Sequence, residues 1–285
     1  MQTEEPTLDV ANLLAGAFVR TVEVHDELGS TNDRAAELAR ELPSGALPAL
    51  VVARRQTAGR GRGSNAWWSA DGALTFSLLI DESSTGVRPA DWPQLSLATA
   101  VAVCDVLEAM DWGLEAQFDG LSQSPAPSPQ HPAIGIKWPN DVFLDGRKVC
   151  GILIESPSGA APAKDRLVVG VGINVNNSWR DAPTEAARNG TALCDATGQI
   201  HDVAALLQEV VRAIAGRIGQ VRTQAGELPE AWRRLNLLQD KRVVVELDGR
   251  QVEGTCVEIA NDGGIVVDTV SGRQQLFSGS IRRWD

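Results

Sequence analysis

Residues 54–72 read RRQTAGRGRGSNAWWSADG and combine positive charge with glycines and two tryptophans. The alternating glycines let backbone amides approach an anion closely, while Arg60 and Arg62 point to the same side if the loop is extended. A flexible loop with two converging cations suits a phosphate or a carboxylate. Two other interpretations stay open at this point. One is a site for single-stranded nucleic acid, in which guanidinium groups pair with phosphates and rings stack on bases; the other is a plain solvated loop.

A third cation, Lys137, opens the string KWPND. Pro139 biases the residue before it towards an extended conformation, and Asn140 and Asp141 resemble a local turn or bulge. A lone lysine in a strand is most often a surface residue. Here, however, the Gly-Arg-Gly-Arg loop precedes it and GVGINVN follows it at residues 170–176, and three such strings in this order form a signature.

The overall charge limits the class of partner. The formal net charge of the 285 residues is −11, so the global field repels a polyanion, and contact with nucleic acid would depend on a local basic patch. With 43% hydrophobic and 22% charged residues, the composition is that of a soluble globular protein. The start carries acids where a secretory signal carries a basic region, and no apolar run reaches membrane-spanning length, so we expect a cytoplasmic protein without a membrane contact.

The cysteines and histidines are too scattered for a dedicated transition-metal centre. No C-x-x-C pair and no H-E-x-x-H string occurs, and the four cysteines are expected to be buried, reduced thiols. Two nucleotide-binding motifs are absent as well. There is no G-x-x-x-x-G-K-[ST], and GVGINV does not complete G-x-G-x-x-G because its last position is Val175.

The elements that must position these strings are of mixed type. Residues 32–42 begin with good N-cap residues, continue in helix formers and stop before a proline, so we expect a helix. The runs ALVVARR and ALTFSLLID are expected as strands on either side of the arginine–glycine loop, and residues 93–110 as a mostly buried helix. Further on we expect two strands in IGIKWPNDVFL and KVCGILIES joined by a tight turn at Asp145-Gly146, a strand in LVVGVGINVN, and helices at about 202–222 and 229–235.

Two segments differ in composition from the rest. Residues 117–132 read QFDGLSQSPAPSPQHP and cannot bury enough apolar surface to offset their ordering entropy, so a mobile insertion is expected. Residues 236–285 are short β-rich runs separated by turn residues, a spacing typical of a small antiparallel barrel or sandwich. We therefore expect an α+β protein with a catalytic-type domain at 1–235 and a small β domain at 236–285.

In combination, the strings resemble the biotin protein ligases. The resemblance is carried by Ser30-Thr31-Asn32, Gln56 with TAGRGR, Trp67, KWPND, KVCGILIE and GVGINVN. They occur in the family's order and cover the core from about residue 22 to 225, and the terminal β module resembles the family's small C-terminal barrel. The resemblance implies a mixed β-sheet flanked by helices, the class II synthetase-like catalytic domain of these ligases.

The resemblance also implies an activity. The family activates the carboxylate of biotin by attack on the α-phosphate of ATP, which gives biotinyl-5'-adenylate and pyrophosphate, and then transfers the biotinyl group to a lysine of a carrier protein. No protein nucleophile is required, because two anions must be brought together and the charge on the phosphoryl oxygens stabilised, and fixed cations supply both. We expect ATP, biotin and Mg²⁺ as ligands, with the magnesium ligands unassigned. The expected partner is the biotin carboxyl carrier protein or domain of a carboxylase.

By resemblance, the site residues fall into three groups. The expected catalytic cations are Arg60, Arg62 and Lys137. The biotin site is expected to include Ser30, Thr31, Asn32, Gln56, Arg60, Gly61, Arg62, Lys137 and Gly151, with glycine-lined strands around Gly151 and Gly172 leaving room for the bicycle. The nucleotide is expected to contact Gly59, Arg62, Trp67, Lys137 and Asn174, with Trp67 covering the adenine. The structural alternatives are a helix cap for Ser30 to Asn32, a core aromatic for Trp67 and a turn residue for Asn174.

The chain departs from the family's pattern after Arg62. The family commonly continues with a further Gly-Arg pair, whereas Gly63-Ser64-Asn65 follows here, so one expected cation is missing. Only 29 residues precede Ser30, so we expect no N-terminal DNA-binding domain and no nucleic-acid partner. Family sheets can pair edge to edge, which leaves a homodimer as an open expectation.

The nearest rival is a lipoate or octanoate ligase or transferase of related fold. A lipoyl site would want a longer apolar tunnel and a differently placed lysine, whereas Ser30 to Asn32 and Gln56 are polar. A buried polar group left unpaired costs roughly 1 to 3 kcal/mol, so polar residues around a ring select against apolar acids. These residues therefore favour biotin. A nucleic-acid-binding module centred on the arginine–glycine loop is the more distant alternative, and it predicts salt-sensitive binding of single strands.

Overall fold

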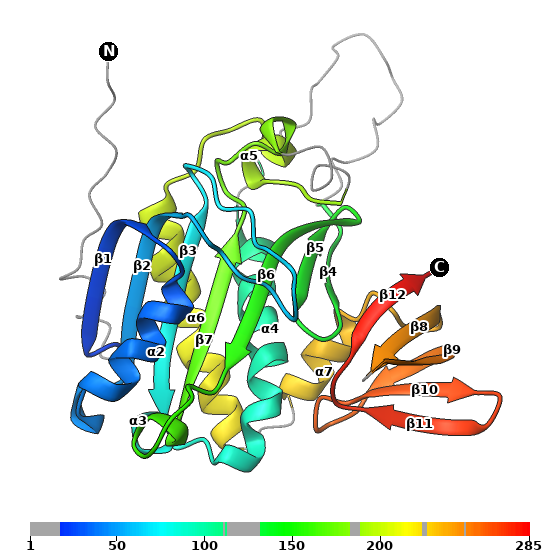
Figure 1. Ribbon diagram of the computed structural model, residues 1–285. Coiled ribbons are helices and arrows are strands. Elements are labelled where there is room, and N and C mark those ends of the chain that lie inside the picture. Colours follow the sequence, from blue (N-terminus) through cyan, green and yellow to red (C-terminus); the bar gives the residue numbers. More distant parts are fainter. Residues whose placement is uncertain (1–17, 111, 113–131, 183–188, 224–226, 248) are drawn as a thin grey trace, which may run out of the picture.

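The computed structural model describes residues 18–110, 112, 132–182, 189–223, 227–247 and 249–285. In this part of the chain, helices cover both faces of a seven-stranded mixed sheet, and a five-stranded antiparallel sheet lies beside it (Figure 1). The expected α+β class, a mixed sheet flanked by helices with a C-terminal antiparallel β module, is confirmed. The insertion expected at 117–132 lies outside the described residues except for Pro132.

The seven-stranded sheet has the strand order β1-β2-β3-β7-β6-β5-β4. Strands β1 and β2 are parallel, and each of the other neighbouring pairs is antiparallel. The central strands β3 and β7 are buried along their whole length, which explains why both read as nearly unbroken apolar runs. The bounds are β1 Thr21–Leu28, β2 Ala49–Gln56, β3 Leu74–Asp81, β4 Ile134–Lys137, β5 Asp141–Leu144, β6 Arg147–Glu155 and β7 Arg166–Ile173.

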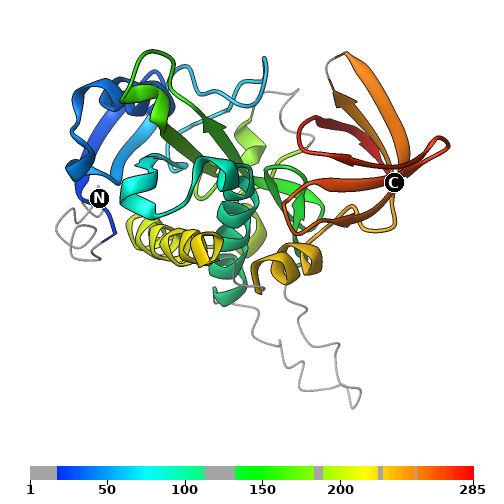
Figure 2. The same ribbon diagram turned by 90° about the horizontal axis from the view of Figure 1, so that it is seen from below.

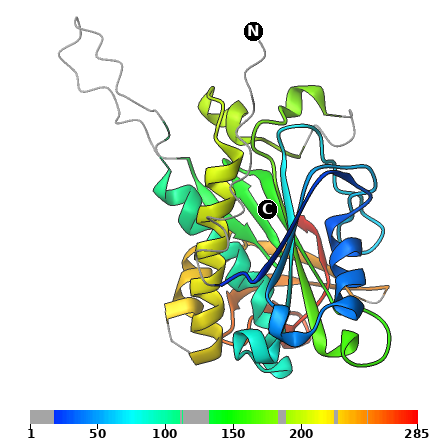
Figure 3. The same ribbon diagram turned by 90° about the vertical axis from the view of Figure 1, so that its left-hand side faces the viewer.

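The helices divide between the two faces of this sheet. Viewed from the β1 edge, α6 (Val203–Thr223) lies on one side and α2 (Thr31–Glu41) on the other (Figure 3). Helix α4 (Leu95–Ala109) packs against α6 and is buried over most of its surface, as its alanine- and leucine-rich sequence predicts. Helix α2 packs on β2, β3 and β7, so its N-terminus with Ser30 to Asn32 lies over the middle of the sheet. The remaining helices are α3 Glu82–Thr85, α5 Leu193–Thr197 and α7 Glu227–Arg234.

The C-terminal module lies at the β4 end of the larger sheet (Figure 2). Its strand order is β11-β10-β9-β8-β12, with bounds β8 Arg242–Leu247, β9 Arg250–Ile259, β10 Ile265–Thr269, β11 Gly272–Leu276 and β12 Ser280–Trp284. The Ile136 amide donates to Leu235 O (2.7 Å), the Leu237 amide donates to Ile136 O (3.0 Å), and Trp138 Nε1 donates to Gly263 O (3.0 Å). One hydrophobic core cluster contains side chains from both sheets. A division into domains at residue 235 stays a prediction.

One expected strand, and one of the β-rich runs expected within residues 236–285, are each two strands in the structure. The run IGIKWPNDVFL turns back at residues 138–140, so that Lys137 pairs with Asp141 across β4 and β5. The run RQQLFSGSIRRW contains β11 and β12, separated by a turn that includes Gly279 with a φ of 129°. The turn at Asp145-Gly146 is confirmed: both residues have positive φ, at 48° and 76°, as the tight hairpin requires.

Candidate functional site

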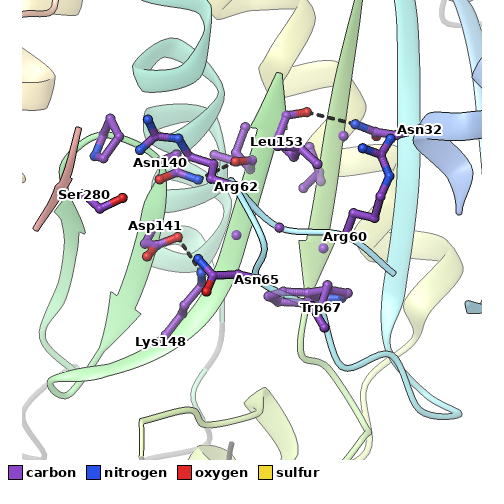
Figure 4. A pocket seen from close by; sticks show the side chains of 18 of the residues that line it. Asn32, Arg60, Arg62, Asn65, Trp67, Asn140, Asp141, Lys148, Leu153 and Ser280 are labelled. Atoms are coloured by element: carbon purple, nitrogen blue, oxygen red, sulfur yellow. Dashed lines mark hydrogen bonds and ion pairs between the residues drawn. The ribbon is translucent and has the colours of Figure 1, made fainter. Parts of the chain in front are cut away.

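A cavity of about 450 Å³ opens on the α2 side of the larger sheet (Figure 4). Its walls are the N-terminus of α2, the arginine–glycine loop, the KWPND turn, the glycines of β6 and β7, and residues 280–282 of β12. Strings that are more than 200 residues apart in sequence therefore meet in one place. Of the expected site residues, the cavity is lined by Ser30, Thr31, Asn32, Gln56, Arg60, Gly61, Arg62, Trp67, Lys137 and Gly151, and not by Gly59 or Asn174.

At one end of the cavity, buried polar side chains form a continuous hydrogen-bond network. The Thr31 amide donates to Gln56 Oε1 (2.7 Å), and Ser77 Oγ lies 2.7 Å from Thr31 Oγ1 and 2.6 Å from Asn32 Oδ1. Asn32 Nδ2 donates to Leu153 O (3.3 Å) and to Glu155 Oε2 (2.8 Å). Ser30 is the N-cap of α2, but its side chain makes no capping hydrogen bond. These hydrogen bonds join the start of α2 to the end of β2, to β3 and to the end of β6.

The Ser77 proton in this network has a defined direction. Asn32 presents its Nδ2 to a backbone carbonyl, so its Oδ1 faces Ser77, and the single Ser77 proton must be donated to it. The one Thr31 hydroxyl proton can then go to Ser77 Oγ, 2.7 Å away, or to Gln56 Oε1, 3.2 Å away. The groups left for a ligand are acceptors on Thr31 and Asn32 and donors on the Gln56 amide and the Ser30 hydroxyl. This end of the cavity is matched to a ring that carries both N–H groups and a carbonyl.

The floor of the cavity is made of glycines because other side chains occupy the space above them. A Cβ on Gly172 would lie 2.5 Å from the Trp67 ring, and one on Gly151, its partner across β6 and β7, would lie 3.1 Å from it. These glycines therefore make room for Trp67, and the expectation that the strands around them leave room for the ligand bicycle stays a prediction. The Trp67 indole N–H is buried and has no hydrogen-bond partner within the described residues.

The arginine–glycine loop is a tight hairpin and not an extended segment. Gly61 N donates to Asn65 O (2.7 Å) and Trp67 N donates to Gly59 O (2.9 Å). As a result, Arg60 and Arg62 do not converge: Arg60 reaches towards Asn32 and Arg62 towards the opposite end of the cavity (Figure 4).

The two arginines also differ in electrostatic state. Arg60 forms ion pairs with Glu155 (2.6 Å) and Asp33 (2.7 Å), and the hydrogen bonds that it donates to Glu155 raise the pKa of the guanidinium. Arg62 Nη1 donates to the backbone carbonyl of Gly279 (2.8 Å), and burial lowers the pKa of its guanidinium. Arg62 thus keeps an uncompensated charge in the cavity, whereas Arg60 does not. Neither guanidinium belongs to a free basic surface of the kind that a nucleic-acid interface needs.

Two lysines and one carboxylate complete the cationic end. Burial lowers the pKa of Lys137, and no carboxylate of the described residues forms an ion pair with it. Lys148 Nζ lies 5.7 Å from the centre of the Trp67 ring and 2.5 Å from Asp141 Oδ1. The buried Asp141 Oδ1 is therefore paired with the Lys148 ammonium. The cations Arg62, Lys137 and Lys148 can therefore hold a polyphosphate, and Asp141 can hold a metal ion.

Four residues had no role in the sequence-based expectation: Lys148 and Asp141, which line the cavity, and Ser77 and Glu155, which form hydrogen bonds with lining residues. Ser77, Lys148, Glu155 and Asp141 belong to strands, where a single polar residue has no distinguishing pattern. Lys148 and Glu155 do stand at the two ends of KVCGILIE, which is the signal that could have identified them. Asn174 is fully buried, donates to Thr191 O (3.0 Å) and accepts from Asn177. Its contact with a nucleotide stays a prediction, as does that of Gly59.

No helix in the described ranges is both long enough and apolar enough to cross a membrane. The described cysteines are free thiols, of which Cys104, Cys150 and Cys256 are buried and Cys194 is half-buried.

Residues 28–174 match the model of the biotin/lipoate A/B protein ligase family. Among curated proteins, the biotin–[acetyl-CoA-carboxylase] ligase of Mycobacterium tuberculosis is 33% identical, over 93% of this chain and 89% of that protein. The bifunctional ligase/repressor BirA of Bacillus subtilis is 31% identical, over 90% of this chain and 72% of that protein. Among solved structures, the biotin protein ligase of Aquifex aeolicus in complex with biotin and ATP superimposes with a TM-score of 0.71 at 28% identity and covers 93% of this chain and 99% of its own.

Proposed function

The chain belongs to the biotin/lipoate A/B protein ligase family, and from this premise we propose that its cavity activates biotin with ATP and transfers the biotinyl group to a lysine of a carrier protein. One observation carries the proposal. A single cavity has three cations with one carboxylate, Asp141, at one end and, at the other, a buried polar network with both donors and acceptors for a ureido ring. The protein is therefore a biotin protein ligase.

The polar end distinguishes biotin from lipoate. The biotin ureido group has one carbonyl and two N–H groups, which match the Gln56 and Ser30 donors and the Thr31 and Asn32 acceptors. The dithiolane ring of lipoate would leave these buried groups unpaired, at a cost of about 1 to 3 kcal/mol for each. Gly61 and Gly151 complete this part of the wall. The related lipoate and octanoate ligases are not favoured as the function.

At the cationic end, the biotin carboxylate attacks the α-phosphate of ATP and pyrophosphate leaves. Arg62, Lys137 and Lys148 hold the two anions together and stabilise the charge that develops on the phosphoryl oxygens. Trp67 rests with one face on Gly172 and offers the other to the adenine. Gly59 and Asn174 contribute indirectly: Gly59 O accepts the Trp67 amide, and Asn174 holds the segment after β7 in place.

The site fits a magnesium ion. Mg²⁺ in nucleotide sites is typically bound by one or two carboxylates together with substrate phosphates. Asp141 lines the cavity next to Asn140, and its Oδ1 is paired with Lys148 Nζ, so a bound ion would share this carboxylate with Lys148. When bound, the ion would neutralise phosphate charge, and Asp141 would hold it close to Lys148.

The second half-reaction needs an acceptor amine. A lysine of a biotin carboxyl carrier domain attacks the acyl carbon of the adenylate, and AMP leaves with the bonding electron pair while the amine loses a proton. We expect this reaction in the cytoplasm. A homodimer stays a prediction, with β1 as an edge strand whose outer side pairs with no other strand among the described residues.

Mass spectrometry tests this function directly. The protein is incubated with ATP, Mg²⁺ and either biotin or lipoate, in the presence and absence of a carrier domain. We expect biotinyl-5'-adenylate and a carrier heavier by one biotinyl group, with no lipoyl product. A lipoyl product without a biotinyl product would overturn the assignment.

A further inference from the structure

Glu155 is the point at which the biotin end of the cavity and the arginine–glycine loop are joined. Its Oε2 accepts hydrogen bonds from Asn32 Nδ2 (2.8 Å) and from Arg60 Nη2 (2.8 Å), and its Oε1 accepts one from Arg60 Nη1 (2.6 Å). Asn32 lies in the first turn of α2, Arg60 lies in the loop between β2 and β3, and Glu155 ends β6. One carboxylate thus connects three elements that are not neighbours in sequence.

The geometry of the Arg60 pair is that of a fixed contact. The guanidinium meets Glu155 through two nitrogens, and such two-pronged pairs hold orientation as well as charge. Asp33, the next residue of α2, accepts a further hydrogen bond from Arg60 (2.7 Å). Because two carboxylates already neutralise the Arg60 guanidinium, it attracts a phosphate only weakly.

This cluster also forms a wall. A second cavity of about 370 Å³ lies on its outer side, between α2 and residues 156–158, and Asn32 and Arg60 line both cavities. If Arg60 swings away from Glu155, the biotin end of the main cavity opens into the second one. The pair therefore separates the buried ureido site from solvent.

We propose that Glu155 is a positioning residue that couples closure of the arginine–glycine loop to the biotin site. This inference rests on the proposed function, and it gives Arg60 a clamp role in place of direct contact with the reacting phosphate. Glu155 aligns the Asn32 acceptor for the ureido ring and at the same time holds Arg60 across the opening. Loss of the Glu155 charge weakens the binding of biotin and the retention of the adenylate, and it leaves the binding of ATP unchanged.

The test measures steady-state constants for Glu155→Gln, which keeps the shape of the side chain and removes its charge. We expect KM for biotin to rise about tenfold, KM for ATP and kcat to stay within about twofold, and biotinyl-adenylate to dissociate faster from the enzyme. Glu37→Gln is the matched control, because Glu37 lines the second cavity on α2 and pairs with Arg34 instead. It should behave as the wild type does.

A double-mutant cycle with Arg60→Gln tests whether Glu155 and Arg60 act together as a clamp or affect biotin binding independently. The clamp predicts that both single variants raise KM for biotin to a similar extent and that the double variant is no worse than either. Multiplicative effects, or a rise in KM for ATP instead of biotin, would overturn the inference. If Glu155→Gln does not fold, Arg60→Gln alone must still show the selective loss of biotin binding. A wild-type enzyme that forms no biotinyl-adenylate would instead remove the proposed function.

Discussion

Replacing Gly170 by alanine should disable the biotin end of the cavity without touching the cations. A Cβ at this position would lie 2.0 Å from Asn32 Oδ1 and 2.8 Å from its Cγ. Asn32 is only 4% exposed and is fixed by hydrogen bonds to Leu153, Glu155 and Ser77, so its side chain can move only by breaking them. Asn32 can therefore avoid the added Cβ only by losing these hydrogen bonds.

The magnitude follows from the groups that lose their partners. The buried Asn32 amide would lose its hydrogen bonds to Leu153 O, Glu155 Oε2 and Ser77 Oγ, and a buried polar group left unpaired costs about 1 to 3 kcal/mol. We expect the free energy of unfolding to fall by about 2 to 4 kcal/mol. Because the Asn32 acceptor no longer faces the ligand, biotin should bind at least about tenfold more weakly, which corresponds to about 1.4 kcal/mol.

Denaturant unfolding and calorimetric titration with biotin measure the two effects on the same sample. Gly216→Ala is the matched control, since Gly216 lies in α6 and a Cβ there would meet no atom within 4 Å. That variant should be stabilised by about 0.5 to 1 kcal/mol and bind biotin normally. A Gly170→Ala protein that binds biotin as tightly as the wild type would refute the placement of Asn32 in the biotin site.

Three further outcomes are expected. Arg62→Ala and Lys137→Ala should each lower the rate of adenylate formation by orders of magnitude, measured as biotin-dependent exchange of pyrophosphate into ATP; unchanged exchange in both would contradict their roles. Burial lowers the pKa of Lys137 below the ordinary 10.5 of a lysine, so kcat/KM for ATP should decline as the pH rises through that lowered pKa. Lys137→Arg keeps its charge at this pH, and the decline should therefore move to higher pH. Asp141→Asn should raise the Mg²⁺ concentration needed for half-maximal activity while leaving biotin binding in the absence of ATP unchanged, as titrations would show.

The elements next to the site could be predicted from sequence where local signals are strong. Residues 32–42 were expected as a helix and are α2, because cap residues and a proline mark both ends. Asp145-Gly146 marks its hairpin for a similar reason, since a tight turn needs positive φ. By contrast, β1 has the sequence TVEVHDEL, whose charged residues suit an edge strand. Nothing in this sequence indicates that β1 pairs with β2.

The contacts within the site could not be predicted, because they depend on tertiary packing. Nothing in LTFSLLID marks Ser77 as the hydroxyl that links Thr31 to Asn32. Likewise, the arginine–glycine pattern indicates an anion-facing loop but not that Arg60 already faces two carboxylates. The contribution of β12 to the cavity wall follows only from how the C-terminal module packs against the KWPND turn.

The central claim is that this cavity adenylates biotin and not lipoate. The most direct measurement is isotope exchange between pyrophosphate and ATP in the presence of Mg²⁺ and of either acid at the same concentration. Exchange that requires biotin and is absent with lipoate is the predicted result. Exchange that is supported by lipoate as well as by biotin, or that does not occur with biotin, would contradict the account.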